Sequence, residues 1–188
     1  FDVDVDGDGD GALRQGSGNN AAFIEAFEDA LGSKFTAIPS SGYGGDVWVQ
    51  DEFEFATLTG EAGQRVDVVI DSIRNRGIDA YKHVLVGDGR DALRRTWGVV
   101  ADRSSYDSFG NLEASPPVTV GGVAYPFGRI YYGRENGVGI SGVLAEFLTS
   151  QKVQAPFELP TRWLCVGHVD EFSSFVPDAS SPKGFKLV

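Results

Sequence analysis

The sequence is poor in cysteine and in basic residues. Its 188 residues include one cysteine, Cys165, which excludes a framework of intrachain disulfides and leaves the redox compartment open. Lys and Arg number 16 against 27 Asp and Glu, which gives a net charge of −11. Because so acidic a chain repels a nucleic-acid backbone, we expect no nucleic-acid partner and favour cationic ligands, either metal ions or arginine-rich substrates.

Long apolar runs and methionine are missing as well. No apolar run approaches the roughly 18 residues that a membrane span requires, so no membrane partner is expected. The chain begins at Phe1 without methionine and has no signal-like segment there, so we expect a processed polypeptide. The compartment is left open, because the acidic ligands and the missing start favour secretion without excluding the cytoplasm.

The first eleven residues, FDVDVDGDGDG, are strongly acidic. Their D-x-D-x-D-G spacing is that of a calcium loop, in which alternating oxygens surround a cation and glycine permits the sharp turn. The candidate ligands are Asp2, Asp4, Asp6 and Asp10. The twelfth position is Leu13 where a complete EF-hand has glutamate, and a disordered acidic tail is the alternative.

Alternating helical and strand patterns predict a mixed α/β fold. A stripe of Phe23, Ile24, Phe27 and Leu31 predicts a helix over residues 20–31, and a second helix is predicted over residues 141–150, with Val143, Leu144, Phe147 and Leu148 facing inward. Strands are predicted over residues 35–38, 66–70, 81–86, 118–120, 124–126 and 129–132, and in the closing KGFKLV. The length suits one sizeable core or part of a larger one.

Residues 162–177, RWLCVGHVDEFSSFVP, carry a polar triplet between apolar residues. This pattern predicts a buried strand, in which His168 and Asp170 project to the same side, roughly 6–7 Å apart. An imidazole would then lie beside a fixed carboxylate, in a setting that shifts pKa values and suits proton transfer. A core histidine held by a carboxylate for structural reasons is the alternative, and this stretch alone does not decide between them.

Residues 46–55, DVWVQDEFEF, form a second informative stretch. In a strand, Gln50, Glu52 and Glu54 would share one face, where three oxygen-bearing side chains repel one another unless a cation lies among them. Asp51 would point the other way into aromatic company, where an unpaired carboxylate is costly and requires a positive partner. An exposed acidic edge strand explains the two glutamates but not Asp51.

Two loops add candidate binding residues. Arg74 and Arg76 flank Asn75 just after a predicted buried strand, a position that suits anchoring of carbonyls or carboxylates, although a solvated loop is the alternative. Residues 107–117, DSFGNLEASPP, are predicted to be irregular and offer Glu113 and backbone carbonyls to a hard cation.

Together these stretches resemble the protein-arginine deiminases, calcium-dependent enzymes that convert peptidyl arginine to citrulline. The matching segments, in family order, are WVQDEFEF, DSIRNRG, DSFGNLEASPPVTV, YPFGRI, QKVQAP and VGHVDEFSSFVP, followed by KGFKLV. They place residues 19–188 in the N-terminal part of the catalytic domain and leave residues 1–18 as an acidic, calcium-binding opening segment. The resemblance implies an α/β fold of the pentein type, a five-bladed propeller that this chain would form only in part.

The resemblance also implies a role for each matched residue. Asp51 and Asp170 would clamp the substrate guanidinium, and His168 would be the general acid and base. Trp48 and Val166 would line the channel for the arginine stem, and Arg74 and Arg76 would hold the peptide backbone. One calcium site would comprise Gln50, Glu54, Glu113 and the carbonyls of Phe109 and Leu112. A second would comprise Glu52, Asp71, Ser72 and Asn75.

The nucleophilic cysteine of the family lies far downstream of the His-x-Asp triplet, in a segment that this chain does not contain. Cys165 does not match that position, and in a strand it would face away from His168, so we interpret it as a small buried thiol. We therefore expect a second polypeptide that supplies the cysteine and the rest of the propeller, and we expect this chain alone to be inactive.

Two other functions stay open. One is a calcium-stabilised, non-catalytic subunit that binds arginine-bearing partners, which would not need His168 beside the clamp. The other is an enzyme that acts on small guanidines such as free arginine or agmatine. The RNRG and DSFGNLE segments favour the enzymes that act on protein arginine.

Overall fold

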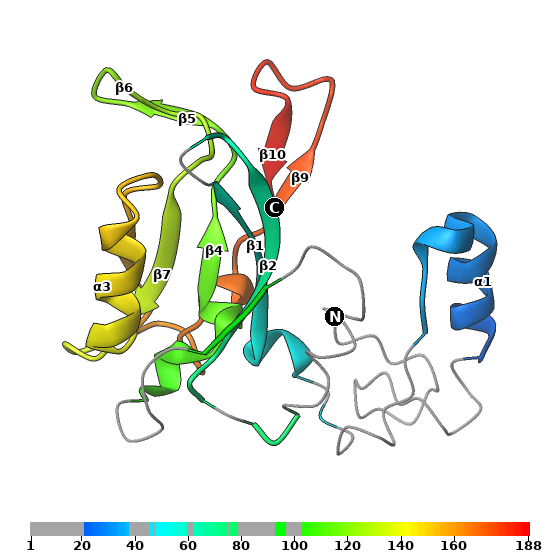
Figure 1. Cartoon of the computed structure of the whole chain (residues 1–188), viewed down its shortest axis with the longest axis horizontal. Helices are drawn as coiled ribbons and strands as arrows, with labels where there is room; N and C mark the ends of the chain where they lie inside the picture. The colour runs from blue at the N-terminus through cyan, green and yellow to red at the C-terminus, as the bar shows by residue number, and fades with distance from the viewer. Residues whose placement is uncertain are drawn as a thin grey trace.

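The computed structural model describes residues 21–37, 46, 48–59, 62–74, 76–78, 93–96 and 103–188, with residues 93–96 described by their backbone alone. The helices are α1 (Ala21–Leu31) and α3 (Gly142–Ser150). The strands are β1 (Phe53–Thr59), β2 (Arg65–Asp71), β3 (Leu93–Thr96), β4 (Leu112–Ala114), β5 (Val118–Val120), β6 (Val123–Tyr125), β7 (Ile130–Arg134), β8 (Phe157–Pro160), β9 (Phe175–Pro177) and β10 (Phe185–Leu187). The architecture is therefore mixed α/β with small sheets, as the sequence predicts (Figure 1).

A three-stranded sheet contains β1, β2 and β3 in that order. β1 and β2 are antiparallel with Phe53 opposite Asp71, and β3 is parallel to β2. The predicted strand over residues 66–70 is confirmed by β2, whose residues 68–71 are all buried. An unbroken apolar run of this kind is typical of a strand covered on both faces.

A second three-stranded sheet has the order β4-β7-β8, with β4 antiparallel and β8 parallel to β7. Helix α3 connects the parallel strands β7 and β8, as a crossover connection requires. Ser141 caps this helix with its hydroxyl, which accepts from Leu144 N at 3.4 Å. The predicted helix over residues 141–150 is thus confirmed, with its first residue serving as the cap.

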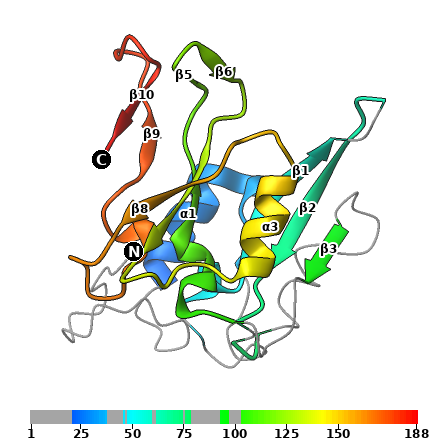
Figure 2. The same cartoon turned by 90° about the vertical axis from the view of Figure 1, so that its left-hand side faces the viewer.

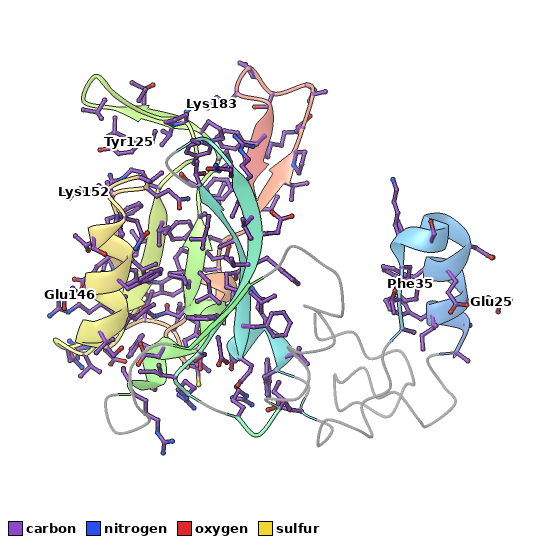
Figure 3. The ribbon with its side chains drawn as sticks, in the orientation of Figure 1. Glu25, Phe35, Tyr125, Glu146, Lys152 and Lys183 are labelled. Atoms are coloured by element: carbon purple, nitrogen blue, oxygen red, sulfur yellow. The ribbon has the colours of Figure 1, made fainter. Side chains whose placement is uncertain are left out.

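The core lies between α3 and these two sheets. Its buried members are Val68, Ile70, Phe109, Leu112, Tyr132, Leu144 and Leu148. The prediction that Val143 faces inward is wrong, because this residue lies on the outer side of α3 and is 39% exposed. Glu146 also points away from the sheets on the same helix (Figure 3).

Two hairpins project from one end of the molecule, one formed by β5 and β6 and the other by β9 and β10 (Figures 1 and 2). The first turns through Gly121 and Gly122, whose φ angles of +58° and +82° favour glycine. The strands predicted on either side of this turn, and the strand predicted in KGFKLV, are confirmed.

Helix α1 forms as predicted over its described residues, but none of them is buried. Phe27 contacts Phe23 and Phe35, with ring centroids 4.6 and 5.6 Å away, and Phe35 lies beside the helix (Figure 3). The apolar stripe is nevertheless exposed among the described residues, because no sheet covers it. No helix in the described ranges is both long and apolar enough to cross a membrane.

Several predicted strands are wrong. Residues 35–37 are irregular, and residues 49–51 form a 3₁₀ turn, so that a strand begins only at Phe53. Residues 169–171 also form a 3₁₀ turn, so the predicted strand over residues 162–177 is reduced to β9. Conversely, the loop predicted over residues 107–117 contains β4. The strand predicted over residues 81–86 lies outside the described residues.

Candidate functional site

The structure brings Asp51, Asp170 and His168 together at Gly110. A Cβ atom added at Gly110 would lie 2.5 Å from Asp170 Oδ2 and 3.1 Å from Asp51 Oδ1, so both carboxylates face the bare Cα of this glycine. Nδ1 of His168 lies 4.0 Å from Asp51 Oδ1. Two carboxylates and an imidazole therefore border one small space, and their catalytic roles stay predictions.

Two 3₁₀ turns position these groups, whereas the sequence predicted two strands. Asp51 ends the turn Val49–Asp51, and Asp170 lies in the turn Val169–Glu171. The second turn is anchored by Val169, which is completely buried. His168 is the N-cap of this turn and Asp170 lies within it, so the two residues reach the site without the alternation of a strand.

The buried residue His168 is held both at its backbone and at its imidazole ring. Its backbone N–H donates to Glu171 Oε1 at 2.7 Å, which closes a capping box around the turn. Its ring Nε2 lies 3.4 Å from the carbonyl oxygen of Ser105. Because a carbonyl only accepts, this contact favours the tautomer with the proton on Nε2 and leaves Nδ1 on the side of Asp51.

The residues before His168 lie differently from the prediction. Cys165 is exposed, so its interpretation as a buried thiol is wrong, because the segment is a surface loop and has no covered strand face. Gly167 has a φ of +91°, and a Cβ there would lie 2.7 Å from the hydroxyl of Tyr106. Glycine is thus required for the loop to approach Tyr106 and deliver His168 to the site.

Asp51 and Asp170 have different electrostatic surroundings. Desolvation raises the pKa of Asp170, and the nearby charge of Asp51 adds to this rise, while His168 opposes it. Asp51 instead has a cation beside it, because Nη1 of Arg76 lies 3.3 Å from Asp51 Oδ2. Burial is therefore the main influence on Asp170, where the charges of His168 and Asp51 act in opposite directions, whereas Asp51 forms an ion pair with Arg76.

Arg76 is held mainly by Asp46. Its Nε donates to Asp46 Oδ2 at 2.8 Å, and its Nη2 donates to Asp46 Oδ1 at 3.0 Å. This hydrogen-bonded pair raises the pKa of Arg76 and lowers the pKa of Asp46. Asp46 belongs to the functional surroundings of the site, and nothing in the sequence pattern marked it.

The other substrate-binding candidates are spread over the surface nearby. Trp48 and Val166 are 58% and 59% exposed, so both side chains are accessible. Nη1 of Arg74 donates to the carbonyl of Ser105 at 3.1 Å, and its backbone N–H donates to Ser72 Oγ at 3.0 Å. The carbonyl of Ser105 thus contacts both Arg74 and His168, a link that sequence reasoning missed because it depends on tertiary structure.

Gln50, Glu54 and Glu113 form the first predicted group of cation ligands. Burial raises the pKa of Glu113 to about 7, with further contributions from the charges of Glu54 and Asp170, while a hydrogen bond with Gln50 lowers it. Burial also raises the pKa of Glu54. These groups therefore lie close enough to interact, and a cation with oxygen ligands fits between them because it would offset their repulsion.

Glu52, Asp71 and Ser72 belong to the second predicted group, and each is at most 3% exposed. Ser72 N donates to the carbonyl of Glu52 at 2.7 Å, which joins the ends of the two segments, and Arg76 N donates to Glu52 Oε2 at 2.8 Å. Two acidic side chains buried at one end of the β1–β2 pair suit a hard cation. The predicted strand face shared by Gln50, Glu52 and Glu54 is wrong, because Gln50 lies in a 3₁₀ turn, Glu52 follows that turn, and only Glu54 belongs to a strand.

Other predicted ligands are less informative. Asn75 and the acidic residues Asp2, Asp4, Asp6 and Asp10 lie outside the described residues. The carbonyl of Phe109 accepts from Leu112 N within a tight turn. Within the part of the chain that the structure describes, no three His, Cys, Asp or Glu side chains gather into a metal cluster. A cation held here would therefore need amide, hydroxyl or backbone oxygens as well.

Comparison with known proteins finds one family throughout. The family model described as protein-arginine deiminase (PAD) matches residues 13–188. Human protein-arginine deiminase type-1 is 43% identical over 181 residues, which is 91% of this chain and 26% of the relative. Human type-3 is 41% identical over 90% of the chain and 26% of its own length, and human type-4 is 43% identical over 82% and 24%. The chain thus spans about a quarter of the length of these relatives.

Proposed function

Because this chain belongs to the protein-arginine deiminase family, we propose that it supplies the guanidinium clamp and the proton-transfer residue of a peptidyl-arginine deiminase. The reaction is the calcium-dependent hydrolysis of peptidyl arginine to peptidyl citrulline with release of ammonia. The single observation that carries the proposal is the convergence of Asp51, Asp170 and His168 on Gly110.

The clamp follows from the shape and charge of guanidinium. This group is planar and presents N–H donors in a rigid fork, which carboxylates accept two at a time. Asp51 and Asp170 come from separate turns and face one space, so each would accept from a different edge of the same guanidinium. The bare Cα of Gly110 leaves that space open.

His168 would handle the proton steps. A cysteine thiolate attacks the guanidinium carbon, the C–N bond breaks, and ammonia leaves with a proton donated by the imidazolium. The imidazole then takes a proton from water, which attacks the same carbon and expels the thiolate. Nδ1 is the atom assigned to these transfers, since Nε2 faces the carbonyl of Ser105.

The cysteine of this reaction is assigned to a segment outside this chain, and we propose that a second polypeptide supplies it. The same partner would complete a five-bladed α/β propeller of which the described sheets are a part. Cys165 is not assigned the role, because its place before the His168 triplet does not match that of the family nucleophile.

Calcium would be held by the two oxygen-rich groups described above. The first comprises Gln50, Glu54, Glu113 and the carbonyls of Phe109 and Leu112. The second comprises Glu52, Asp71, Ser72 and Asn75. When bound, calcium would supply positive charge that offsets the repulsion around Glu113 and Asp170 and steadies the turn that carries Asp51. Residues 1–18 are proposed as a separate calcium-binding segment.

A citrulline assay on the complete protein that contains this chain tests the proposal. With calcium it should convert an N-acylated arginine amide to the citrulline product, and the His168→Ala and Asp170→Ala variants should lose nearly all of this activity while staying folded. Most of the activity surviving in either variant would contradict the assigned roles. Arginine binding without citrulline formation by the unaltered protein would instead favour a non-catalytic binding subunit.

A further inference from the structure

Tyr106 packs beside the segment that delivers His168 to the site, and the proposed reaction gives it no role. It is buried, with 5% of its surface exposed. Its ring meets the imidazole of His168 edge to face, with the two centroids 6.4 Å apart. A Cβ added at Gly167 would lie 2.7 Å from the hydroxyl oxygen of Tyr106 and 3.1 Å from its Cε1. Tyr106 therefore lies against both the imidazole and the backbone of the residue before it.

The hydroxyl of Tyr106 is held by Glu135, which follows β7. It donates to Glu135 Oε2 at 3.1 Å. Desolvation raises the pKa of Tyr106, and the hydrogen bond with Glu135 raises it further, so the hydroxyl keeps its proton and continues to donate. Glu135 is itself fixed, because its Oε1 accepts from Asn136 Nδ2 at 3.1 Å and its backbone N–H donates to the carbonyl of Val138 at 2.8 Å. The ring of Tyr106 is thus tethered at the end that faces Gly167.

The backbone beside Tyr106 contacts the same imidazole. The carbonyl oxygen of Ser105 lies 3.4 Å from His168 Nε2. Tyr106 and this carbonyl belong to one 3₁₀ turn, Ser105–Asp107, which a capping box with Ser104 closes. The ring contact and the backbone contact on His168 therefore come from a single short turn.

The turn that carries Asp170 has an anchor of its own. Ser173 donates to the carbonyl of Val169 from its backbone N–H at 3.2 Å and from its hydroxyl at 2.9 Å. Val169 is completely buried. A change at Tyr106 should therefore displace His168 more than Asp170.

We infer that Tyr106, tethered by Glu135, is a positioning residue that keeps the imidazole of His168 in place for proton transfer. The inference rests on the proposed function. Proton transfer requires the donor within hydrogen-bond reach of the reacting group, and a misplacement of about 1 Å can cost roughly 100-fold in rate. Tyr106 acts through His168, whereas the guanidinium is bound by the two aspartates. Loss of the tether should consequently lower kcat and leave substrate affinity unchanged.

A Tyr106→Phe variant tests this inference, because it removes the hydroxyl and keeps the ring. In the complete protein with calcium, kcat for an N-acylated arginine amide should fall roughly tenfold, less than a full 1 Å misplacement would cost. With the nucleophilic cysteine also replaced by serine, the calorimetric Kd for the amide should change less than twofold. Partial unfolding would instead lower the binding stoichiometry together with kcat, and a thermal unfolding scan identifies it independently.

Variants of Glu135 test the tether from its other end. Glu135→Leu removes the acceptor and should lower kcat to a similar extent. Since both changes break one contact, the double variant should lose much less than the product of the two single losses. Glu135→Gln keeps an acceptor oxygen and should hold kcat within about threefold of the unaltered protein. The matched control is Tyr132→Phe, which removes the hydroxyl of another buried tyrosine and should keep kcat within about twofold.

A fall in kcat at unchanged amide affinity, without additivity in the double variant, supports the inference. It is overturned if kcat is unchanged in a folded Tyr106→Phe, if affinity falls as much as kcat, or if Tyr132→Phe loses as much. Should Tyr106→Phe not fold, equal kcat values in Glu135→Leu and Glu135→Gln overturn it, and a loss confined to Glu135→Leu supports it. Absence of citrulline formation by the unaltered protein would count against the proposed function, so the two claims fail on different observations.

Discussion

The turn that carries Asp51 and the turn that carries Asp170 have the same backbone form but different electrostatic surroundings. Asp51 has the guanidinium of Arg76 at 3.3 Å, whereas Asp170 has a pKa that is raised mainly by burial, with a smaller contribution from the charge of Asp51. The charge of Asp170 also acts on Glu113, because it contributes to the raised pKa of that residue. The chain thus places an arginine beside Asp51, whereas on Asp170 the charge of His168 opposes that of Asp51. For this reason we expect substitutions of the two aspartates to have different effects.

The largest expected effect comes from displacing the carboxylate of Asp170 from its position beside Gly110. In Gly110→Ala, the new Cβ would lie 2.5 Å from Asp170 Oδ2 and 3.1 Å from Asp51 Oδ1, so the carboxylate of Asp170 must shift away from residue 110. Misplacement of a catalytic group by about 1 Å can cost roughly 100-fold in rate, so we expect a loss of that order in kcat/KM for an arginine amide.

The matched control is Gly142→Ala. A Cβ at Gly142, near the start of α3, would meet nothing within 4 Å, so its kcat/KM should stay within about twofold of the unaltered protein. Equal losses in both alanine variants would show that the effect does not arise from the separation of Asp51 and Asp170.

Calcium should act on the acidic groups around Glu113 and Asp170. A ligand that binds only the folded state at 100 times its Kd stabilises that state by about 2.7 kcal/mol, so calcium should raise the Tm of the complete protein and a chelator should lower it. Glu113→Gln should reduce this calcium-dependent shift in a thermal unfolding scan. Glu146→Gln, on the outer side of α3, should leave it unchanged, and an equal reduction in both variants would contradict the ligand assignment.

Replacing Asp51 and Asp170 one at a time tests the difference between their surroundings. Without calcium at pH 8, Asp51→Asn should lower the free energy of unfolding by about 0.5–1 kcal/mol, because Arg76 loses a partly shielded partner. Asp170→Asn removes a carboxylate that repels its neighbours, so it should leave the free energy of unfolding unchanged or raise it slightly. Denaturant unfolding of both variants measures this, and the opposite order would contradict the described asymmetry.

The smallest expected effect concerns Asp46. The pKa of Asp46 is lowered by its hydrogen bonds with Arg76, so the pair stabilises the fold above the pKa of an unfolded aspartate, about 3.9, and this contribution is lost as the pH falls through the lower folded value. The free energy of unfolding should therefore fall more steeply below about pH 4 in the unaltered protein than in Asp46→Asn, by less than about 1 kcal/mol. Asp29→Asn on the exposed helix α1 is the control, and an identical acid dependence in Asp46→Asn would remove this assignment.

The secondary structure was predictable where one face or both faces of an element are apolar. The run Val68–Ile70 belongs to a buried strand, and the pattern around Leu144 and Leu148 belongs to a helix with a covered face. The glycine pair at the tip of the β5–β6 hairpin was equally informative, because its positive φ angles are a local property. Periodicity and turn chemistry are enough for elements of this kind.

The predicted site residues Asp51, Asp170 and His168 lie near one another in the structure, but their local structure differs from the prediction. Asp51 and Asp170 were both placed on strands, yet both lie in 3₁₀ turns, where three-residue segments are too short for a periodic pattern to reveal. The family resemblance is what pointed to Asp51, Asp170 and His168 as a group, and their roles stay predictions.

Asp46 and Gly110 show what sequence reasoning could not reach. The role of Asp46 arises from contact with Arg76, thirty positions along the chain, and no spacing rule connects the two. Gly110 stands in a segment rich in turn-forming residues, where a glycine is expected for conformational reasons. Its function as a spacer depends on two carboxylates that arrive from other turns.

The most direct measurement is a crystal structure of the complete protein bound to calcium and an N-acylated arginine amide, with the nucleophilic cysteine replaced by serine. We expect the guanidinium between Asp51 and Asp170, within hydrogen-bonding distance of both carboxylates, with His168 beside it. A guanidinium bound elsewhere, or in contact with neither aspartate, would contradict the assignment of this site.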